Sequence, residues 1–392
     1  MVSDFLTGKV DAIVQAIEVV LAGVARPVAL HEPSFQGSEW LYVKECLDTG
    51  WVSSVGSYVD KLERDLGEYV GGYAVAVVNG TAALEVTMRL SGVKTDDEVL
   101  IPALTFVATA NAVSYCGALP HFIDSDEETL GVDPSALADY LSDIAEVKSG
   151  ECFNRLTGRR IAALLPMHTF GHPVDIDPLL ELADRYKLAF VEDAAESLGS
   201  YYKGRHTGTI SELGALSFNG NKIMTTGGGG AILARNRAMA ARAKHLTTTA
   251  RLSHRWNFTH DEVGYNYRMP NINAALGCAQ LEQVPNWLER KRVLAARYES
   301  AFASVDGVRV VVEPGYARSN YWLNTLLLDK ASLPLRDAIL ETTNEIGIQT
   351  RPVWNLISEL PMYASCPRMP LNRAIDLEQR IVSLPSSPKL AH

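Results

Sequence analysis

A regular alternation of short apolar runs and helix-like segments is the feature of this sequence that most limits its fold. Five apolar runs cover residues 74–78, 98–102, 120–124, 161–165 and 188–193. The segments between them have helical spacing of apolar residues or begin with Asp-Pro, as at Asp133-Pro134. Strands separated by helices of this length favour parallel pairing with helices on both faces. We therefore expect an α/β fold with a mostly parallel central sheet.

The two ends of the 392-residue chain differ from this middle part. After about Val284 the pattern indicates a helix over 335–346 and short strands over 308–312 and 323–328, typical of a smaller α+β domain. Residues 4–23 have the apolar spacing of a helix, which predicts an arm packed on the body or on a second subunit. We therefore expect three parts: an N-terminal helical arm (1–30), a large domain (31–283) and a small C-terminal domain (284–392).

Composition excludes some classes of function. The net charge of −10 argues against nucleic acid or an anionic membrane as the main partner. No apolar run approaches the length of a membrane span. Five scattered cysteines without a CxxC pair predict no metal site and fit a reducing compartment. Because the N-terminus lacks the pattern of a signal peptide, we expect a cytoplasmic protein.

One lysine stands out by its surroundings. Lys222 lies between the apolar runs 214–218 and 231–234 and is followed by four glycines at 227–230. Both flanks resemble strands, so we expect the lysine on a tight connection, where glycines allow a close backbone approach. A lysine held there could form a Schiff base with an aldehyde cofactor. The alternative is a glycine-rich hairpin with a solvated lysine.

Three other strand ends carry what an aldehyde-bearing pyridine cofactor such as pyridoxal phosphate needs. Gly80 and Thr81 begin a helix after a strand and could bind a phosphate, or Thr81 could be an ordinary helix cap. Phe106 could stack on the ring, or simply be core. Asp193 ends an apolar strand and could keep the ring nitrogen protonated, or occupy a turn. Because ligands bind beyond the carboxyl ends of parallel strands, we expect these residues to meet Lys222.

Several longer motifs point to a known family. They comprise residues 80–84, 102–109, 193–199, 202–204, 217–230, 264–269, 350–354 and 384–387. From about His31 to Ser387 the sequence resembles the DegT/DnrJ/StrS family, which are fold-type-I pyridoxal-phosphate aminotransferases acting on nucleotide-linked keto sugars. Two positions depart from the pattern: Ser358 stands where relatives often have histidine, and Glu196 where many have glutamine.

The resemblance implies roles for particular residues. Lys222 would form the Schiff base, Asp193 would pair with the pyridine nitrogen, and Glu196 would lie near the ring hydroxyl. Phe106 would stack on the ring, and the phosphate would be held by Gly80, Thr81 and Ser217. In the family the active site lies at a dimer interface, so a homodimer is expected, with Asn266 reaching the neighbouring subunit. The expected substrate-binding residues are Ser54, Asn221, Arg268 and Arg351.

The resemblance also implies an activity. L-glutamate would donate its amino group to the 4-keto carbon of a UDP-, GDP- or dTDP-linked 6-deoxy sugar carrying a 2-acetamido group, for polysaccharide or lipopolysaccharide biosynthesis. The long N-terminal helix resembles the branch that acts on bacillosamine- or legionaminic-type precursors. The alternatives are a 3-keto-sugar aminotransferase, an idle partner subunit, or a sugar dehydratase of the same fold. Lys222 argues against the last, in which histidine replaces the lysine.

Overall fold

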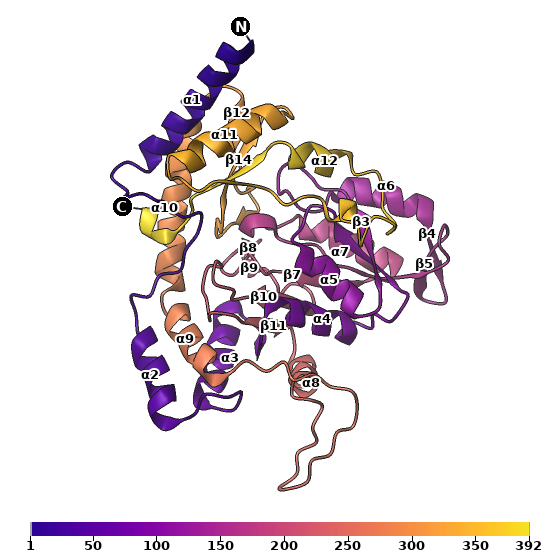
Figure 1. The fold of residues 1–392 in the computed structure, drawn as a ribbon. Helices are drawn as coiled ribbons and strands as arrows, with labels where there is room; N and C mark the ends of the chain where they lie inside the picture. The colour runs from indigo at the N-terminus through magenta and orange to yellow at the C-terminus, as the bar shows by residue number, and fades with distance from the viewer. Residues whose placement is uncertain (1, 392) are drawn as a thin grey trace.

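The structure of the protein is a computed structural model that describes residues 2–391, with side chains from Leu6 to Ala391 (Figure 1). Met1 and His392, the outermost residues of the expected arm and small domain, lie outside the described residues. Two sheets of different size form the framework, and a third, of three strands, is minor.

The large sheet has nine strands and is mostly parallel, as predicted. Its strands follow the order β1 (Tyr73–Val77), β11 (Gly230–Ala234), β10 (Leu213–Ser217), β7 (Ala189–Asp193), β6 (Arg160–Leu164), β2 (Glu98–Pro102) and β3 (Leu119–Ile123). A hairpin of β4 (Ala145–Lys148) and β5 (Glu151–Asn154) pairs with β6 through β5. Apart from this hairpin, only β11 runs against its neighbours. The carboxyl ends of β1, β10, β7 and β2 therefore meet at one edge.

Helices cover both faces of this sheet (Figure 1). They are α3 (Ser57–Val70), α4 (Gly80–Leu90), α5 (Val107–Tyr115), α6 (Pro134–Ile144), α7 (Ile176–Tyr186), α8 (Arg237–Thr247) and α9 (Asn271–Leu281), with α2 (Glu39–Thr49) packed on α9. The predicted cap of α6 is confirmed: the Asp133 carboxylate accepts hydrogen bonds from the backbone N–H groups of Ser135 and Ala136. The sheet interior is almost continuously apolar because it is buried on both faces.

The small sheet is antiparallel. Its order is β12 (Val308–Val310), β14 (Asn324–Leu328), β16 (Ile381–Leu384) and β15 (Arg351–Pro352), flanked by α10 (Val284–Phe302) and α11 (Leu333–Glu345). The N-terminal helix α1 (Val2–Val20) packs on α10 and α11. Its residues Ile13 and Ile17 share a buried apolar cluster with Tyr298 and Ile339. The chain's first helix therefore shares a core with its C-terminal part.

The remaining elements are short. They are β13 (Ala317–Arg318), β8 (Tyr201–Tyr202) and β9 (Arg205–His206), which form the three-stranded sheet, together with α12 (Asn372–Glu378) and the 3-10 turns Thr169–Gly171, Ile357–Glu359 and Pro388–Leu390. None of the helices within residues 2–391 combines the length and hydrophobicity that a membrane span requires.

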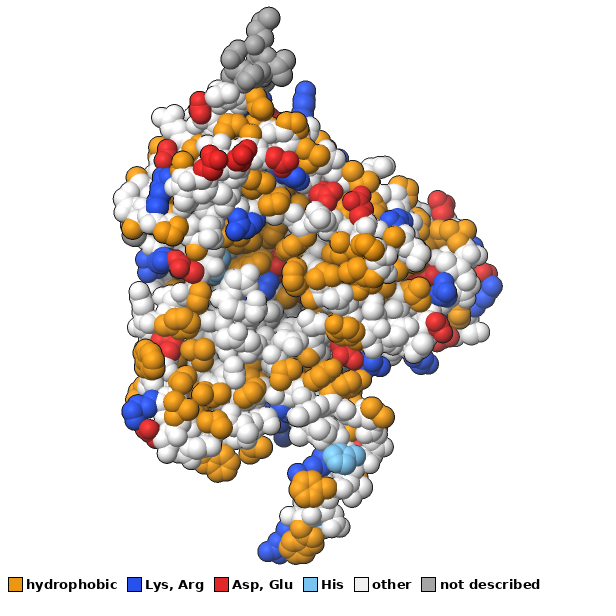
Figure 2. All heavy atoms as spheres, viewed as in Figure 1, with side chains coloured by type: hydrophobic (Ala, Val, Ile, Leu, Met, Phe, Trp, Pro, Cys, Tyr) orange, Lys and Arg blue, Asp and Glu red, His pale blue; other side chains and the backbone are white. Residues whose placement is uncertain are grey.

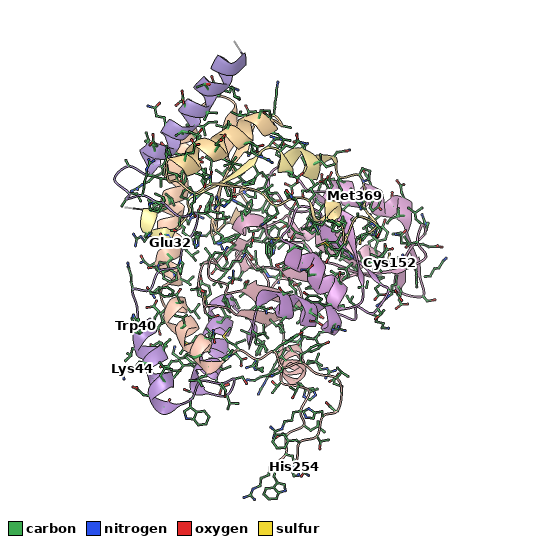
Figure 3. The ribbon with its side chains drawn as sticks, viewed as in Figure 1. Glu32, Trp40, Lys44, Cys152, His254 and Met369 are labelled. Carbon is green, nitrogen blue, oxygen red and sulfur yellow. The ribbon has the colours of Figure 1, made fainter. Side chains whose placement is uncertain are left out.

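A long arm between α8 and α9 projects from the body (Figures 1 and 3). Antiparallel bridges join Thr248 to Asn266 and Arg251 to His260. Figure 2 shows hydrophobic and basic side chains at its far end, where Trp256 and Phe258 are exposed. The arm carries apolar surface that the subunit itself does not cover.

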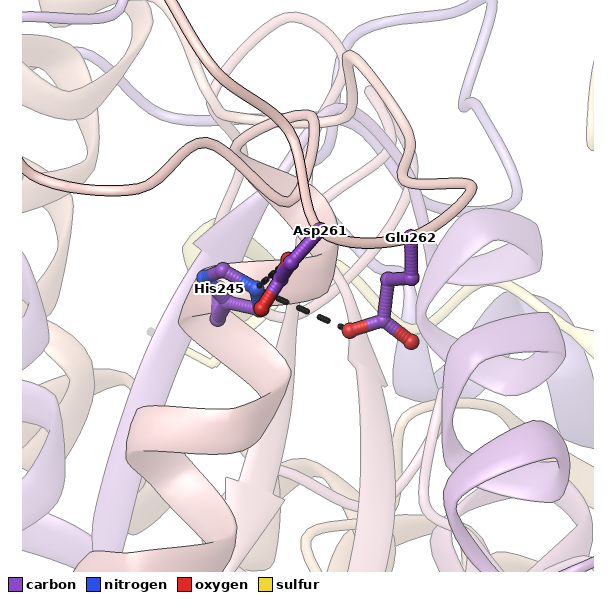
Figure 4. Close-up of side chains that lie close together, drawn as sticks. All are labelled: His245, Asp261 and Glu262. Carbon is purple, nitrogen blue, oxygen red and sulfur yellow. Dashed lines mark hydrogen bonds and ion pairs between the residues drawn. The ribbon is translucent and has the colours of Figure 1, made fainter.

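Ion pairs tie the base of this arm to α8. His245, Asp261 and Glu262 lie close together (Figure 4), with His245 Nε2 2.7 Å from an Asp261 carboxylate oxygen. The Glu262 carboxylate is engaged by both terminal nitrogens of Arg242. Because an arginine already holds this carboxylate, the group functions as an ion-pair network that fixes the arm.

Candidate active site

A pocket of about 410 Å³ lies at the edge where the parallel strands end. It brings together eight of the residues expected from the sequence: Gly80, Thr81, Phe106, Asp193, Glu196, Ser217, Asn221 and Lys222. They come from the ends of β1, β2, β7 and β10, which are far apart along the chain. Parallel pairing is what gathers them, because it places all four carboxyl ends at one edge.

Lys222 lies on the wall of this pocket with its side chain largely buried. Its Nζ is 3.0 Å from Glu196 Oε1 and 3.8 Å from the centre of the Trp322 ring. Its backbone N–H donates to the Asn219 carbonyl at 3.0 Å, in a turn just after β10. The connection is not the tight turn that was expected, since residues 218–229 separate β10 from β11.

Asp193 is buried at the end of β7. One carboxylate oxygen accepts a hydrogen bond from the Thr109 hydroxyl at 2.8 Å, and the other accepts from the backbone N–H of Ala195 at 3.1 Å. Burial raises the pKa of Asp193, while the Thr109 hydroxyl and the positive charge of Lys222 act to lower it. A buried carboxylate of this kind gains from a cationic partner, which a protonated ring nitrogen provides.

Glu196 is also buried and links the lysine to the pocket wall. Its second oxygen accepts a hydrogen bond from the Phe170 backbone N–H at 2.9 Å. Burial raises the pKa of Glu196, and the charge of Lys222 opposes that rise. Glu196 and Asp193 therefore both place a buried carboxyl group in the lining of one cavity.

The N-terminus of α4 supplies donors for an anion. Asn79, not Thr81, is the cap of this helix, and its side chain accepts from the Ala82 N–H at 2.7 Å. The N–H groups of Gly80 and Thr81 remain as first-turn donors, and the positive end of the helix dipole favours a phosphate there. Ser217 lies opposite: a Cβ on Gly80 would meet the Ser217 Cβ at 2.9 Å.

The glycine run beside the lysine has the close approach that was expected of it. A Cβ on Gly230 would lie 2.7 Å from backbone atoms of Asn79 and Gly80, and Gly227 has a φ of +79°. A Cβ on Gly229 would meet Thr226 Oγ1 at 2.1 Å, whereas Gly228 has open space around it. Two of the four glycines are thus required by packing and one by backbone conformation.

The structure does not bring four expected residues into this pocket. Asn266 is exposed at the base of the arm, and Ser54 lies in the loop before α3. Arg351 is exposed on β15 and donates to Asn344 Oδ1. Arg268 is buried, with its guanidinium 2.6 Å from Glu63 and bonded to the Ala76 carbonyl. Because Glu63 and Ala76 engage it, Arg268 braces α3 against β1.

Three residues that sequence reasoning missed line the same pocket. Thr109 bonds Asp193, Trp322 faces Lys222, and Trp354 packs 6.2 Å from Phe106, ring centre to ring centre. Thr109 lies on the first turn of α5, just after Phe106, so its position near a strand end could have been recognised in the sequence. The tryptophans come from the C-terminal part of the chain. Ser358, by contrast, is buried outside the pocket lining.

The donor set of the pocket fits pyridoxal phosphate. The N-terminus of α4 opens into the pocket at Gly80 and Thr81, Phe106 offers a half-exposed ring, and Asp193 is a buried carboxylate in the pocket lining. Lys222 provides the amine. All four requirements of the cofactor are met within one cavity.

Comparisons with known proteins agree. The model of the DegT/DnrJ/EryC1/StrS aminotransferase family matches residues 33–392. The chain is 37% identical to the GDP-perosamine synthase of Escherichia coli O157:H7, over 93% of this chain and 94% of the relative. It is also 37% identical to the putative pyridoxal phosphate-dependent aminotransferase EpsN of Bacillus subtilis, over 86% and 84%. Among solved structures, S. venezuelae DesV superposes with a TM-score of 0.79 at 30% identity, over 90% of each chain.

These relatives sharpen the sequence expectation. The fold-type-I aminotransferase fold is confirmed, but the narrower expectation of a bacillosamine or legionaminic branch finds no support among the relatives just named. Together with the pocket, the match over residues 33–392 shows that the chain belongs to the DegT/DnrJ/EryC1/StrS family and is a pyridoxal-phosphate-dependent nucleotide-sugar aminotransferase.

Proposed function

We propose that the protein transfers the amino group of L-glutamate to the 4-keto carbon of a nucleotide-linked 4-keto-6-deoxy sugar. The observation that carries this is the meeting of Lys222, Asp193 and the N-terminus of α4 in one pocket. The name of the relative from Escherichia coli O157:H7, a GDP-perosamine synthase, supports a sugar of this class. Five unpaired cysteines fit a reducing compartment for the reaction.

Each residue has a task in this reaction. Bound pyridoxal phosphate supplies an aldehyde that takes up the amino group and a ring that stabilises negative charge. Lys222 Nζ accepts the proton of the glutamate α-carbon in the first half and returns a proton to the sugar C4 in the second. Asp193 holds a proton on the ring nitrogen, while Gly80, Thr81 and Ser217 bind the phosphate. Phe106 covers the ring, and Glu196 orients Lys222.

A substrate panel tests this proposal. The purified protein with its cofactor is offered L-glutamate and 4-keto-6-deoxy hexoses linked to GDP, UDP or dTDP, the UDP sugar with and without a 2-acetamido group. We expect a 4-amino sugar, identified by mass and NMR, together with 2-oxoglutarate. Ammonia release would instead support the dehydratase, and a 3-amino product from a 3-keto-6-deoxy sugar nucleotide added to the panel would support the 3-keto aminotransferase. Lys222→Ala is the control, and transamination by that variant would refute the role of the lysine.

We also propose a homodimer whose active sites are shared between subunits. The exposed face of α2 carries Trp40, Leu41 and Leu47, and hydrophobic side chains gather over this region (Figures 2 and 3). The arm offers further exposed apolar groups, with Asn266 at its base. Surface of this kind on two neighbouring parts of one subunit favours burial against a second copy.

Heterodimers test the shared site. A dimer purified with two different tags combines one Lys222→Ala subunit with one Asn266→Ala subunit. If Asn266 acts across the interface, one of the two sites is intact, and about half of the parent's activity is expected. If the heterodimer is no more active than the Lys222→Ala and Asn266→Ala homodimers, Asn266 does not act in the neighbouring subunit's site.

A further inference from the structure

Trp322 lies against the reactive lysine although it comes from the C-terminal part of the chain. The centre of its ring is 3.8 Å from Lys222 Nζ, and the same nitrogen is 3.0 Å from Glu196 Oε1. The amine is therefore held by a ring and a carboxylate together. A cation over the face of tryptophan is attracted by the ring electrons, and this attraction grows when water is excluded.

Hydrogen bonds on several sides fix the position of Trp322, which is buried. Its ring Nε1–H donates to the Asn221 carbonyl at 2.7 Å, so the ring is tied to the residue preceding the lysine. Its backbone N–H donates to Asn320 Oδ1 at 2.7 Å. Tyr321, just before it, has a φ of +46°, a conformation that a bulky residue adopts only when its surroundings require it.

The same segment is bonded to the rest of the site. The Asn320 side chain donates to the carbonyls of Glu196 and Leu198, both at 2.9 Å. On the other side, Lys291 of α10 is fully buried, and its Nζ donates to the carbonyls of Trp322 at 3.1 Å and of Ser386. Burying a lysine that meets only carbonyl groups is costly. The buried amine nevertheless fixes the backbone of Trp322 through the bond to its carbonyl.

We propose that Trp322 is a positioning residue of the reaction: its ring face receives the Lys222 amine whenever that amine is free, and keeps it beside the carbon whose proton it moves. The inference rests on the proposed role of Lys222 as the group that carries the proton. An amine held in this way stays out of bulk water and returns to the same place in both halves of the reaction. A shift of about 1 Å in a reacting group can lower a rate by roughly a hundredfold.

The ring is not the only group beside the amine. Its electrons attract the amine in its cationic form. The acidic groups facing the amine are Glu196 and Asp193. His31, in the segment before α2, interacts electrostatically with Lys222, and burial lowers the pKa of His31 well below its usual range.

The test compares variants with and without a ring. Trp322→Leu removes the ring and Trp322→Phe keeps it without the bond to Asn221; Trp322→Met is a second ring-free variant if the leucine variant does not fold. In the cofactor-free protein, the rate of Lys222 acetylation by acetic anhydride at a fixed pH is followed by peptide mass spectrometry. We expect Lys222 to react roughly 3- to 10-fold faster in the ring-free variants, because the ring no longer holds the amine, and at a rate near that of the parent in Trp322→Phe.

Kinetics of the cofactor-loaded enzyme give the second readout. In the ring-free variants we expect kcat to fall roughly 10- to 100-fold, with KM for the sugar changed less than about threefold. Trp322→Phe should keep kcat within about fivefold of the parent.

Two results would overturn the inference: an unchanged rate of Lys222 acetylation in the ring-free variants, or a phenylalanine variant as impaired as they are. Failure of the proposed function would look different, since the parent would then not transaminate, or Lys222→Ala would still do so. A parent that transaminates, an inactive Lys222→Ala and an unaffected Trp322→Leu would refute the role of Trp322 alone.

Discussion

At the scale of single residues, burial decides what the acidic groups of the pocket can do. Asp193 is held by Thr109 and the Ala195 N–H in a buried position where its pKa is raised. Its charge is stabilised when a cation lies beside it. We therefore expect Asp193→Asn to retain the visible absorbance of the bound cofactor but to slow proton removal from glutamate by roughly 10²–10⁴-fold, measured in single-turnover experiments. A variant with parent-like rates would show that the carboxylate is not needed on the ring nitrogen.

The site residues that could be predicted from the sequence are those that lie at or just after an apolar strand. Lys222, Thr81, Phe106 and Asp193 each follow a recognisable strand, so the sequence alone placed them at one edge. Trp322 could not be found in this way, because the packing of the C-terminal part against the pocket brings it to Lys222.

The position of Arg268 within its own subunit could not be predicted from the sequence either. Its guanidinium is bonded to Glu63 of α3, and nothing in the motif around position 268 indicates that partner. Long-range contacts of this kind depend on tertiary packing, which a single sequence does not display.

At the scale of elements, the connection between β10 and β11 fixes the start of α4. Gly230 lies so close to Asn79 and Gly80 that a methyl group would have to displace backbone atoms at 2.7 Å. We expect Gly230→Ala to lower the free energy of unfolding by about 1–3 kcal/mol and to weaken cofactor binding, because the phosphate donors of α4 would shift. Urea unfolding and a cofactor titration by absorbance measure the two effects.

The matched control is Gly220→Ala, in the same connection between β10 and β11, where a Cβ meets no atom within 4 Å and the residue does not line the pocket. It should leave both quantities near those of the parent. Equal effects of the two substitutions would mean that loss of glycine flexibility, and not a collision with α4, is responsible.

The order of elements was more predictable than their pairing. Alternating strands and helices over 74–193 gave the parallel part of the sheet, and the cap at Asp133 was correctly located. The hairpin of β4 and β5 and the short strands β8, β9 and β13 were missed. They are only two to four residues long, so an alternation of apolar and polar residues cannot be recognised in them. β13 also pairs with β8, which is distant in sequence.

At the scale of the whole molecule, Lys291 links stability to pH. Burial lowers the pKa of its amine well below its usual range. Between that lowered value and the value in the unfolded chain, the unfolded state binds a proton that the native state does not, so stability from this group rises with pH. In Lys291→Met this dependence disappears, while the bonds to Trp322 and Ser386 are lost at every pH.

We therefore expect the parent to gain stability relative to Lys291→Met as the pH rises from 7 to 10, by at most about 1.4 kcal/mol per pH unit. Urea unfolding of both proteins at four pH values measures the difference. Lys94→Met, at an exposed position, is the control and should differ from the parent by the same amount at each pH. A constant difference for Lys291→Met would mean that the buried amine is protonated in the native state.

The sharing of one core by α1, α10 and α11 has a consequence for the newly made protein. About 260 residues separate α1 from α10, and at about 5–20 residues per second the ribosome needs roughly 13–50 s to make them. During that time the apolar face of α1, with Ile13 and Ile17, has left the ribosome before the surface that will cover it exists. The first helix to emerge is thus among the last to be buried, and its apolar face stays exposed during translation unless another protein covers it.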